Sequence, residues 1–385
     1  MKNKPLLSIA IATKNREKYC IETIKSILNY KDPRIEIAVA DNSDTNAVQV
    51  LVNEINSPQV KYLYDNTLIS SIDNFNRAME LATGEYVILI GDDDSIHYKI
   101  MEVVEWMKTN DIESVCSKDT FTFLWPGAHP NFPNGNLSIP NFKDSYTIAD
   151  PQKEIIKLLN NGLVNYFFYK VPKSYHGIVK KSLMNEVKVK TGNYYGALSP
   201  DIFSVVSLSL LIKKHAVLDY PISIAGVCPT STTSDQIKGK HSGDLKDMPH
   251  LKNRKIPYNW DKLVPEIYSV PTTWADSGLN ALSAMNREDL RAEFNYYPLI
   301  AHTILINRNF FLKYSIKKSE EFRKLQKTPF LVFWYKASKS VFRLLYDKFK
   351  LVSKSKKEGS VLSYSEMYNF QNVFEKINTI DFYKS

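Results

Sequence analysis

The sequence predicts an α/β protein in which a mostly parallel sheet is flanked by helices and followed by a mainly helical C-terminal extension. Short apolar runs alternate with helix-length amphipathic segments over roughly the first 110 residues, the pattern of strand–helix units in a parallel sheet. From residue 259 onward the pattern becomes mainly helical. One apolar run ends in Asp92, Asp93 and Asp94, and open α/β sheets bind their ligands at the carboxyl ends of such strands.

Four strands and four helices are expected in the first part of the chain. After the opening apolar run, Ile21, Ile24, Ile27 and Leu28 fall on one face of a helix. The expected strands cover residues 6–12, 35–40, 60–64 and the apolar run after Gly84, and the expected helices cover 17–28, 46–55, 70–82 and 101–108.

The middle of the chain is less regular. Residues 125–145 carry four prolines and are expected to form a long loop, which in a compact domain is usually functional or mobile. Residues 230–250 are polar and rich in turn formers, so they are a candidate loop over a site. Further elements expected are helices near 152–160 and 202–213, a strand at 176–179, and a strand-like segment over 217–227 that Pro221 places at an edge or bend.

Composition fits an ordinary globular protein. The 385 residues are 44% hydrophobic and 24% charged, and we find neither 18 consecutive apolar residues nor an N-terminal apolar stretch, so we expect no transmembrane helix and no secretory signal. The three cysteines are widely spaced, which favours a reducing cytoplasm over a disulfide framework or a zinc site. The net charge of +9 favours anionic partners, but no nucleic-acid-binding motif is present.

The three consecutive aspartates are the first candidate site. Like charges at the end of a buried strand repel one another and are costly unless a cation neutralises them. Mg²⁺ is commonly held by one or two carboxylates together with substrate phosphates. The alternative is a solvated acidic turn or a helix N-cap, since Asp is favoured at both.

Four segments together resemble glycosyltransferase family 2, whose members have the GT-A fold. The first two are a strand and turn, Leu-Ser-Ile-Ala-Ile-Ala-Thr-Lys-Asn-Arg at 7–16, and a second strand with an Asp-rich turn, Val-Ala-Asp-Asn-Ser-Asp at 39–44. The others are a helix with the lead-in Ala-x-Gly-Glu-Tyr at 74–86 and an Asp-x-Asp motif, Ile-Leu-Ile-Gly-Asp-Asp-Asp at 88–94. This Gly-Asp-Asp-Asp form is similar to that of bacterial O-antigen and capsule glycosyltransferases.

The resemblance implies a Rossmann-like GT-A domain in two halves. Residues 1–115 would be the half that binds a nucleotide-sugar, and residues 116–235 the half that binds the acceptor. Residues 236–385 would form the helical C-terminal region. The match is good over 5–115, weaker to about 235, and uninformative beyond.

The same resemblance assigns a nucleotide-binding role to seven residues: Thr13, Asn15, Arg16, Asp41, Asn74, Asp92 and Asp93. Each has a structural alternative. Thr13 or Asn15 could cap a helix in an ordinary βα turn. Asp41 could form an Asx turn or an N-cap, with Asp44 the better cap candidate. Arg16 could meet phosphate oxygens or lie on the surface.

A metal site is also implied, in which Asp92 and Asp94 hold Mg²⁺ or Mn²⁺ against the donor's diphosphate. In extended backbone Asp93 would point to the opposite side. A histidine could complete such a site. Neither His176 nor His241 has ligand spacing to other residues, so both are expected to be packed or on the surface, with His241 the better ligand candidate.

The family inverts the anomeric centre, which requires a base on the acceptor side. Asp201, in Ser-Pro-Asp at 199–201, resembles the acid that the family places at the start of a helix, and a partly desolvated carboxylate suits the role. The same tripeptide is also a good helix start, with Ser199 as N-cap and Pro200 at the first position. The family's commoner Glu-Asp pair is missing here.

A basic amphipathic stretch at 330–357 mixes aromatic residues with eight Lys or Arg and the single acid Asp347. Such helices lie on anionic membrane surfaces. The alternative is a helix that packs on the catalytic domain with a basic outer face. A membrane contact suits a lipid-linked acceptor, and we expect a cytoplasmic protein on the inner face of the membrane.

The sequence therefore predicts an inverting, metal-dependent glycosyltransferase that moves a sugar from a nucleotide-sugar to a glycan acceptor. A sugar-nucleotide pyrophosphorylase would need a glycine-rich phosphate loop after the first strand, and Thr13-Lys-Asn-Arg contains no glycine. The alternative from another class is a non-catalytic glycan-binding or assembly protein on the same scaffold. The donor, the acceptor and the oligomeric state are not predicted.

Overall fold

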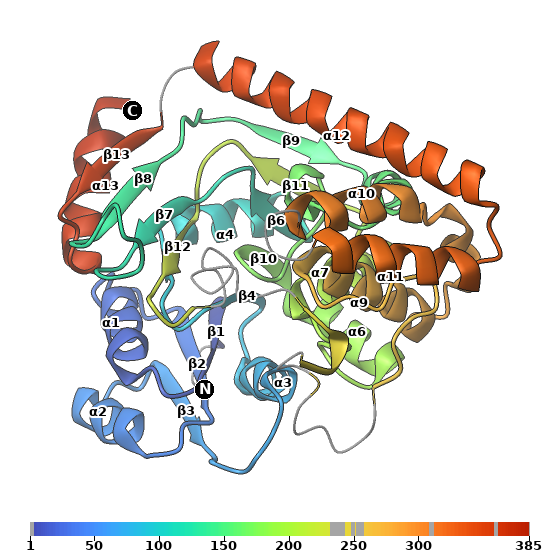
Figure 1. Cartoon of the computed structure of the whole chain (residues 1–385). Coiled ribbons are helices and arrows are strands. Elements are labelled where there is room, and N and C mark those ends of the chain that lie inside the picture. The colour runs from blue at the N-terminus through green and yellow to red at the C-terminus, as the bar shows by residue number, and fades with distance from the viewer. Residues whose placement is uncertain are drawn as a thin grey trace.

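The computed structural model describes residues 4–231, 243–247, 251, 258–307, 312–357 and 361–384. Its centre is an eight-stranded sheet in the order β3-β2-β1-β4-β10-β6-β11-β9, with helices on both faces (Figure 1). The strands are β1 (Leu7–Thr13), β2 (Ile35–Asp41), β3 (Val60–Tyr64), β4 (Tyr86–Ile90), β6 (Ser114–Ser117), β9 (Tyr146–Ala149), β10 (Gly177–Lys180) and β11 (His215–Leu218). Strands β1 to β4 pair in parallel, whereas β10 is antiparallel to both neighbours.

Alternate residues of the parallel strands supply the two faces of this sheet, as the pleat requires. On one face, Leu7, Ile9 and Ile11 pack against α1 (Glu17–Leu28), α2 (Ala47–Ile55) and α4 (Ile100–Thr109). On the other face lie α3 (Ser71–Leu81), α5 (Pro151–Asn160), α6 (Lys181–Thr191), α7 (Pro200–Leu211) and α9 (Val270–Ala284). The predicted α/β class, with a mostly parallel sheet between helices, is confirmed.

Helix starts follow local sequence signals. Ser70 caps α3 in a reciprocal capping box with Asp73, and Asp150 accepts from two amides at the start of α5, where Pro151 occupies the first turn. At α7, Pro200 takes the first position, but Ser199 makes no side-chain cap hydrogen bond. The expected N-cap at Asp44 is wrong, since α2 begins after Asn46 without a side-chain cap.

A second, five-stranded sheet lies beside the first, in the order β13-β8-β7-β12-β5. Its strands are β5 (Ser95–Ile96), β7 (Phe121–Leu124), β8 (Asn136–Ile139), β12 (Ser223–Val227) and β13 (Leu362–Ser365). The sequence did not predict this sheet. Residues 125–145 were expected to be loop but contain β8, and residues 217–227 were expected to be one strand but hold the end of β11 and then β12, in different sheets.

The C-terminal region is mainly helical, as predicted, but its end returns to the second sheet. The helices are α10 (Tyr296–Asn307), α11 (Leu312–Leu325), α12 (Phe330–Lys357) and α13 (Phe370–Lys384), with short 3₁₀ turns η2 (Leu245–Asp247) and η4 (Glu288–Glu293). A further 3₁₀ turn, η1 (Tyr166–Phe168), lies earlier in the chain, between α5 and β10. Phe370 and Val373 of α13 pack with Phe123 and Trp125. In Figure 1, α12 runs across the top of the molecule while β13 and α13 lie beside β8.

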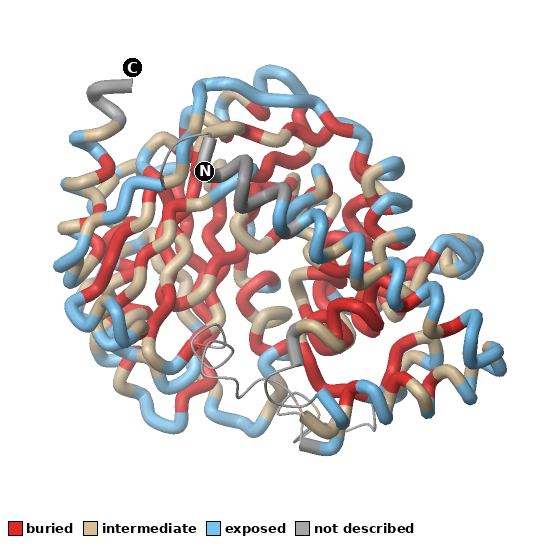
Figure 2. The backbone as a smooth tube through the Cα atoms, turned by 45° about the horizontal axis from the view of Figure 1, so that its top comes forward, coloured by how far each residue is buried: buried red, intermediate tan, exposed pale blue. Residues whose placement is uncertain are grey.

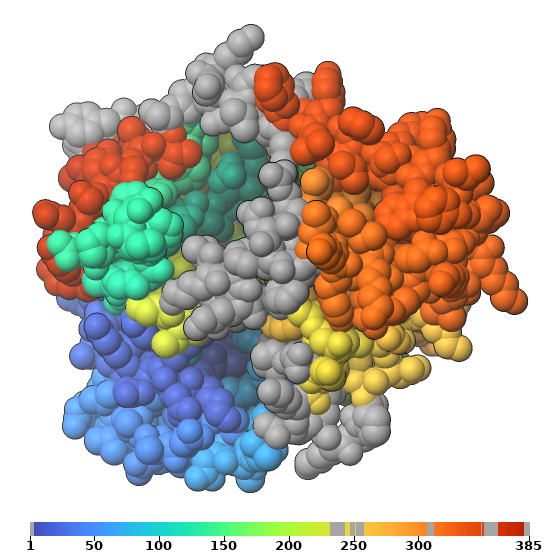
Figure 3. Space-filling model, in the orientation of Figure 1, coloured from blue at the N-terminus to red at the C-terminus, as the bar shows by residue number. Residues whose placement is uncertain are grey.

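Burial separates α12 from the elements around it. In Figure 2 the central strands are mostly red, whereas α12 is largely pale blue and tan. In Figure 3 the first strands and helices, in blue, and α10 and α11, in orange, take opposite sides of the visible face.

Most of the expected loop at 230–250, including His241, lies outside the described residues. The division at residue 115 stays a prediction.

Candidate active site

The three aspartates form the turn that joins the two sheets. β4 ends at Ile90, and Gly91-Asp92-Asp93-Asp94 leads directly into β5 of the second sheet. The amide of Asp94 donates to the carbonyl oxygen of Gly91 at 3.3 Å. We expected extended backbone with Asp93 facing away from its neighbours. That was wrong, because the turn places Asp92 and Asp93 on the same cavity.

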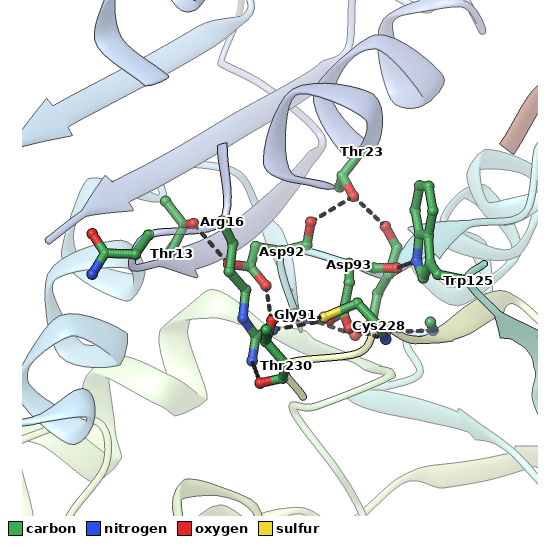
Figure 4. A network of polar contacts seen from close by, with 12 residues as sticks. Thr13, Arg16, Thr23, Gly91, Asp92, Asp93, Trp125, Cys228 and Thr230 are labelled. Atoms are coloured by element: carbon green, nitrogen blue, oxygen red, sulfur yellow. Dashed lines mark hydrogen bonds and ion pairs between the residues drawn. The ribbon is translucent and has the colours of Figure 1, made fainter. Parts of the chain in front are cut away.

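Asp92 is held from the first βα loop (Figure 4). The hydroxyl of Thr13 donates to one carboxylate oxygen at 2.7 Å, and the guanidinium of Arg16 donates to the other at 2.8 Å. Thr23 on α1 donates to the backbone oxygens of Asp92 and Asp94, which fixes the turn itself. Burial raises the pKa of Asp92 and outweighs the stabilising contacts with Arg16 and Thr13.

Asp94 faces the protein interior. Its oxygens accept from the amides of Gly91 (2.6 Å) and Gly226 (2.7 Å), from the hydroxyl of Tyr175 (2.9 Å), and pair with Nε2 of His176 at 3.1 Å. Burial alone would raise its pKa, but the charge of His176 and these hydrogen bonds bring the pKa below the ordinary value. Asp94 is thus an ionised, internally neutralised anchor between the two sheets.

His176 was expected to be packed or on the surface, and it is packed against the turn, whereas His241 lies outside the described residues and its preference stays a prediction. The imidazole bridges Asp94 and Ser223, whose hydroxyl lies 3.0 Å from Nδ1. We call Gly91-Asp92-Asp93-Asp94 the acid turn. Sequence spacing did not indicate His176 as a partner of this turn, because the two are about 80 positions apart in the chain. The pairing of β10 with β4 brings them together.

The contacts of the Asp93 carboxylate are longer than those of the Asp92 carboxylate. One carboxylate oxygen accepts from the amide of Cys228 at 3.0 Å, and the other lies 3.6 Å from the guanidinium of Arg16. Its backbone oxygen accepts from the indole N–H of Trp125. Burial, together with the charges of Asp94 and Asp92, raises the pKa of Asp93 to about 7. The turn therefore holds more negative charge than its surroundings neutralise.

A cavity of about 490 Å³ opens in front of the turn. The candidate base Asp201 lines the same cavity as Asp92 and Asp93. Although the residue is only partly buried, its carboxyl group is surrounded by protein, and this desolvation raises its pKa to about 6 against the opposing effects of His176 and a hydrogen bond from Tyr166. Other predicted residues that line the cavity are Thr13, Arg16 and Asn74.

Asn74 lines this cavity and carries a buried, unpartnered acceptor. Its amide nitrogen donates to the backbone oxygens of Thr13 and Ala40. Its side-chain oxygen is buried and has no hydrogen-bond partner among the described residues. Buried polar atoms are nearly always paired, so this oxygen is suited to accept a hydrogen bond from a bound ligand.

Asn15 and Asp41 do not line the cavity. The side chain of Asn15 pairs with Asp44, donating to its carboxylate and accepting from its amide, so it ties together the loops after β1 and β2. Asp41 accepts from the amide of Ser43, as in an Asx turn, and from the hydroxyl of Tyr62 at 2.5 Å. The proposed structural alternative for Asp41, an Asx turn, therefore describes its contacts.

The residues at the turn fit a divalent cation through Asp92 and Asp93. Within the described parts of the chain, no group of three or more His, Cys, Asp or Glu is arranged to hold a metal, but Mg²⁺ often takes only one or two carboxylates and completes its shell with substrate phosphates. The charge of Asp93 is offset only by the Cys228 amide and by Arg16 at 3.6 Å. Asp94, the second ligand expected from the sequence, already accepts four contacts and does not line the cavity.

Residues 8–124 match the family model for glycosyl transferase family 2. The match covers less than half of the chain, and we call this stretch the family 2 domain. It contains every residue predicted to bind nucleotide or metal, whereas Asp201 lies outside it. The family 2 domain covers β1 to β7 and includes the acid turn.

Curated relatives align over the same part of the chain. WcaA of Escherichia coli K12, named for colanic acid biosynthesis, is 35% identical over 96 residues, which are 24% of this chain and 34% of that protein. The GalNAc(5)-diNAcBac-PP-undecaprenol β-1,3-glucosyltransferase of Campylobacter jejuni is 30% identical over 95 residues, 24% of this chain and 31% of its own length. The matches span about a third of these two relatives.

Among solved structures, S. aureus TarS 1–349 in complex with UDP-GlcNAc aligns over 92% of both chains, with 14% identity and a TM-score of 0.49. Within the described residues, no helix has both the length and the apolar character needed to cross a membrane.

Proposed function

We propose that this protein is an inverting, metal-dependent glycosyltransferase that moves a sugar from a nucleotide-sugar to a glycan acceptor. The observation that carries the proposal is that Asp92 and Asp93, in the family 2 domain, share one cavity with Asp201, about 110 residues later in the chain. Asp92 and Asp93 are suited to hold a cation against the leaving diphosphate, and Asp201 is suited to take the proton of the incoming hydroxyl.

At the donor end, Asp92 and Asp93 would hold the divalent cation. When bound, such a cation stabilises the negative charge that develops on the departing nucleoside diphosphate. Thr13 and Arg16 keep the Asp92 carboxylate in place, and Arg16 can also meet phosphate oxygens bidentately. The unpartnered oxygen of Asn74 would accept a hydrogen bond from the nucleoside.

At the acceptor end, Asp201 would act as the general base. With a pKa of about 6, it is ionised at neutral pH and yet more basic than an exposed aspartate, which is what proton transfer from a hydroxyl requires. The acceptor oxygen bonds to the anomeric carbon as the bond from that carbon to the diphosphate breaks. The hydroxyl proton passes to Asp201, which Tyr166 orients through its hydrogen bond.

The acceptor is proposed to be linked to a lipid diphosphate. The Campylobacter relative is named for an undecaprenol-diphosphate substrate, and so is WfaP of Escherichia coli, which is 27% identical over 108 residues, 28% of this chain and 43% of that protein. Such an acceptor would be met at the cytoplasmic face of a membrane.

The surface of α12 supports a peripheral membrane contact. Its outward stripe, defined here as Leu331, Tyr335, Phe342, Tyr346 and Phe349, follows helical spacing. These side chains are 68–80% exposed. An apolar stripe flanked by Lys and Arg is the arrangement of helices that lie in the interface of an anionic bilayer.

Release of nucleoside diphosphate tests the proposed reaction. Nucleotide-sugars would be offered with a synthetic lipid-diphosphate-linked sugar to wild type, Asp201→Asn and the surface control Asp119→Asn. We expect Asp201→Asn to lower turnover by about 10²–10⁴-fold while donor binding persists, and Asp119→Asn to match wild type. Turnover by Asp201→Asn at the wild-type rate would remove Asp201 as the base.

A further inference from the structure

A second cavity lies between α12 and the turn η1. Its volume is about 1040 Å³, and it is lined by residues of α5, η1, α10 and α12. Helices α10 and α12 lie side by side here, as Figure 1 also shows. We call this cavity the α12 groove. None of the predicted site residues lines it.

One wall of the α12 groove is basic. Lys336, Lys339 and Arg343 line it from successive turns of α12. Arg343 lies 3.9 Å from Asp347, which also lines the groove. Lys336 and Lys339 form no ion pair with any described residue, so their charge is available to an anion.

The facing wall is aromatic. Phe167 and Phe168 line the groove and are 45% and 66% exposed, and their rings contact each other with centroids 4.8 Å apart. Tyr297 lies under the ammonium of Lys336 at 5.2 Å. Glu293 is the one acid on this side of the groove among the described residues. A ligand that fits both walls needs an anionic group and an apolar part.

A partition of aromatic side chains separates the α12 groove from the cavity of about 490 Å³ in front of the three aspartates, which we call the acid cavity. Trp274 lines the acid cavity, and its ring contacts Tyr166 and Phe167 with centroids 5.1 and 5.9 Å apart. Tyr166 hydrogen-bonds to Asp201 on one side of this partition, while Phe167 lines the groove on the other. A ligand in the groove therefore lies next to the residues that orient the proposed base.

We propose that the α12 groove binds the lipid-phosphate part of the acceptor, an amphiphile with a phosphate or diphosphate group and a hydrocarbon chain. Lys336, Lys339 and Arg343 contact the phosphate oxygens, and Phe167 and Phe168 contact the chain. This inference rests on the proposed function, since it names the acceptor class and places the part of the acceptor that does not react.

The position of the groove favours a lipid held in the membrane, and not a free phosphate compound, as the ligand that carries the phosphate group. The three cations lie on α12 beside its outward stripe, so a lipid in the bilayer beneath the stripe would reach them without leaving the membrane surface. Cations along such a stripe attract anionic headgroups. A free phosphate ligand would leave the aromatic wall without a partner.

Binding of farnesyl diphosphate in the presence of a chelator tests this proposal, because the chelator removes the metal on which nucleotide binding at the acid turn depends. Inorganic diphosphate and farnesol serve as the two partial probes. The test variant is Lys336→Gln/Lys339→Gln/Arg343→Gln. The matched control, Lys317→Gln/Lys324→Gln/Lys327→Gln, removes the same charge from exposed positions on and after α11.

We expect wild type and the control to bind farnesyl diphosphate at least about tenfold more tightly than either partial probe, and the test variant to bind it about tenfold more weakly. Phe167→Ser/Phe168→Ser, at exposed positions, should reduce farnesyl diphosphate binding to the level of inorganic diphosphate. Equal binding by the test variant and the control, or no preference for farnesyl diphosphate in wild type, would overturn the groove assignment.

The two proposals fail separately. Binding of a nucleoside diphosphate with Mn²⁺ at the acid turn can be followed separately, as a rise in the Tm of the protein. This rise should persist in the test variant. If that shift persists while farnesyl diphosphate fails to bind, only the groove assignment is lost. If the shift is missing from wild type, the proposed function is lost whatever the groove binds.

Discussion

At the scale of single residues, the three neighbouring aspartates differ in pKa and in role because their surroundings differ. Asp94 accepts four contacts and keeps its charge. Asp92 is held by Thr13 and Arg16. Asp93 is buried with the least compensation, and its pKa is raised to about 7. One carboxylate thus anchors the turn while two present charge to the cavity.

Asp93→Asn should stabilise the metal-free protein at alkaline pH. The native pKa of Asp93 lies above its unfolded value, so the native state binds more protons between about pH 4 and 7 and stability falls as pH rises through that window. Removing the charge should raise Tm by roughly 2–6 °C at pH 8 and change it little at pH 4. Thermal melts in chelator at both values measure this.

Asp94→Asn is the matched comparison for that experiment. Because its oxygens accept from two amides and a hydroxyl, an amide NH₂ in their place leaves a donor facing a donor, and Tm should fall at pH 8. A higher Tm for Asp94→Asn than for Asp93→Asn would contradict the assigned roles.

We expect the pH dependence of turnover to follow the ionisation of Asp201. If this carboxyl group takes the acceptor proton, it must be ionised, so the rate should fall about tenfold per pH unit below its pKa of about 6. The profile of kcat against pH measures this. Tyr166→Phe, which removes the hydrogen bond that lowers the pKa of Asp201, should move the acidic limb to higher pH, and an unmoved limb would contradict that contact.

The sequence motifs predicted one part of this site well. Thr13, Arg16 and the acid run are near the ends of the neighbouring parallel strands β1 and β4, and strand order brings them together. Asn74 lies on α3 and reaches them through hydrogen bonds to the backbone of β1 and β2. Tyr166, Tyr175 and His176 were missed or undervalued, because they come from segments whose position depends on the antiparallel strand β10. Trp125 was also missed. Its indole N–H donates to a backbone oxygen, and such a contact cannot be recognised from the sequence.

At the scale of elements, the backbone of β12 closes the acid turn. Gly226 donates its amide to Asp94, and a Cβ at this position would overlap the backbone oxygen of Asp93. The approach of strand β12 to the turn therefore requires glycine. The two sheets meet at this contact.

Gly226→Ala should lower stability and weaken nucleotide binding, because the new methyl group forces β12 away from the turn. We expect a loss of about 1–3 kcal/mol in the free energy of unfolding, measured by denaturant titration. Gly243→Ala, where the added Cβ meets no atom of the described residues within 4 Å, is the control and should stay within about 0.5 kcal/mol of wild type. Similar stabilities for the two variants would contradict a tight contact at Gly226.

The outward stripe of α12 should be needed for membrane binding and not for folding. Leu331→Ser/Phe342→Ser/Phe349→Ser changes three side chains that are 72–80% exposed, so Tm should change little. Binding to vesicles with anionic lipid should fall by about tenfold or more, since each loses roughly 1–2 kcal/mol of burial in the interface. Cosedimentation measures this. Vesicle binding equal to wild type would show that α12 does not carry the contact.

At the scale of the whole molecule, the two sheets and the helical region place three functions around the acid cavity. In the proposed function, the family 2 domain would supply the donor end and α7 the base, while α12 with its groove lies beyond the Tyr166–Trp274 partition. The alternation of strands and helices predicted the first sheet. The second sheet was not predicted, because its short strands come from five separate segments and the last of them, β13, follows α12.

The most direct test of the central claim is a thermal-shift panel of UDP, GDP, CDP and dTDP, each with Mn²⁺ or with chelator, on wild type and Asp92→Asn. A ligand that binds only the native state raises Tm by mass action. We predict that one nucleotide raises the Tm of wild type only with Mn²⁺, and that Asp92→Asn loses this shift. No shift with any nucleotide would contradict the account, and would leave the acid turn as a structural link in a non-catalytic glycan-binding or assembly protein.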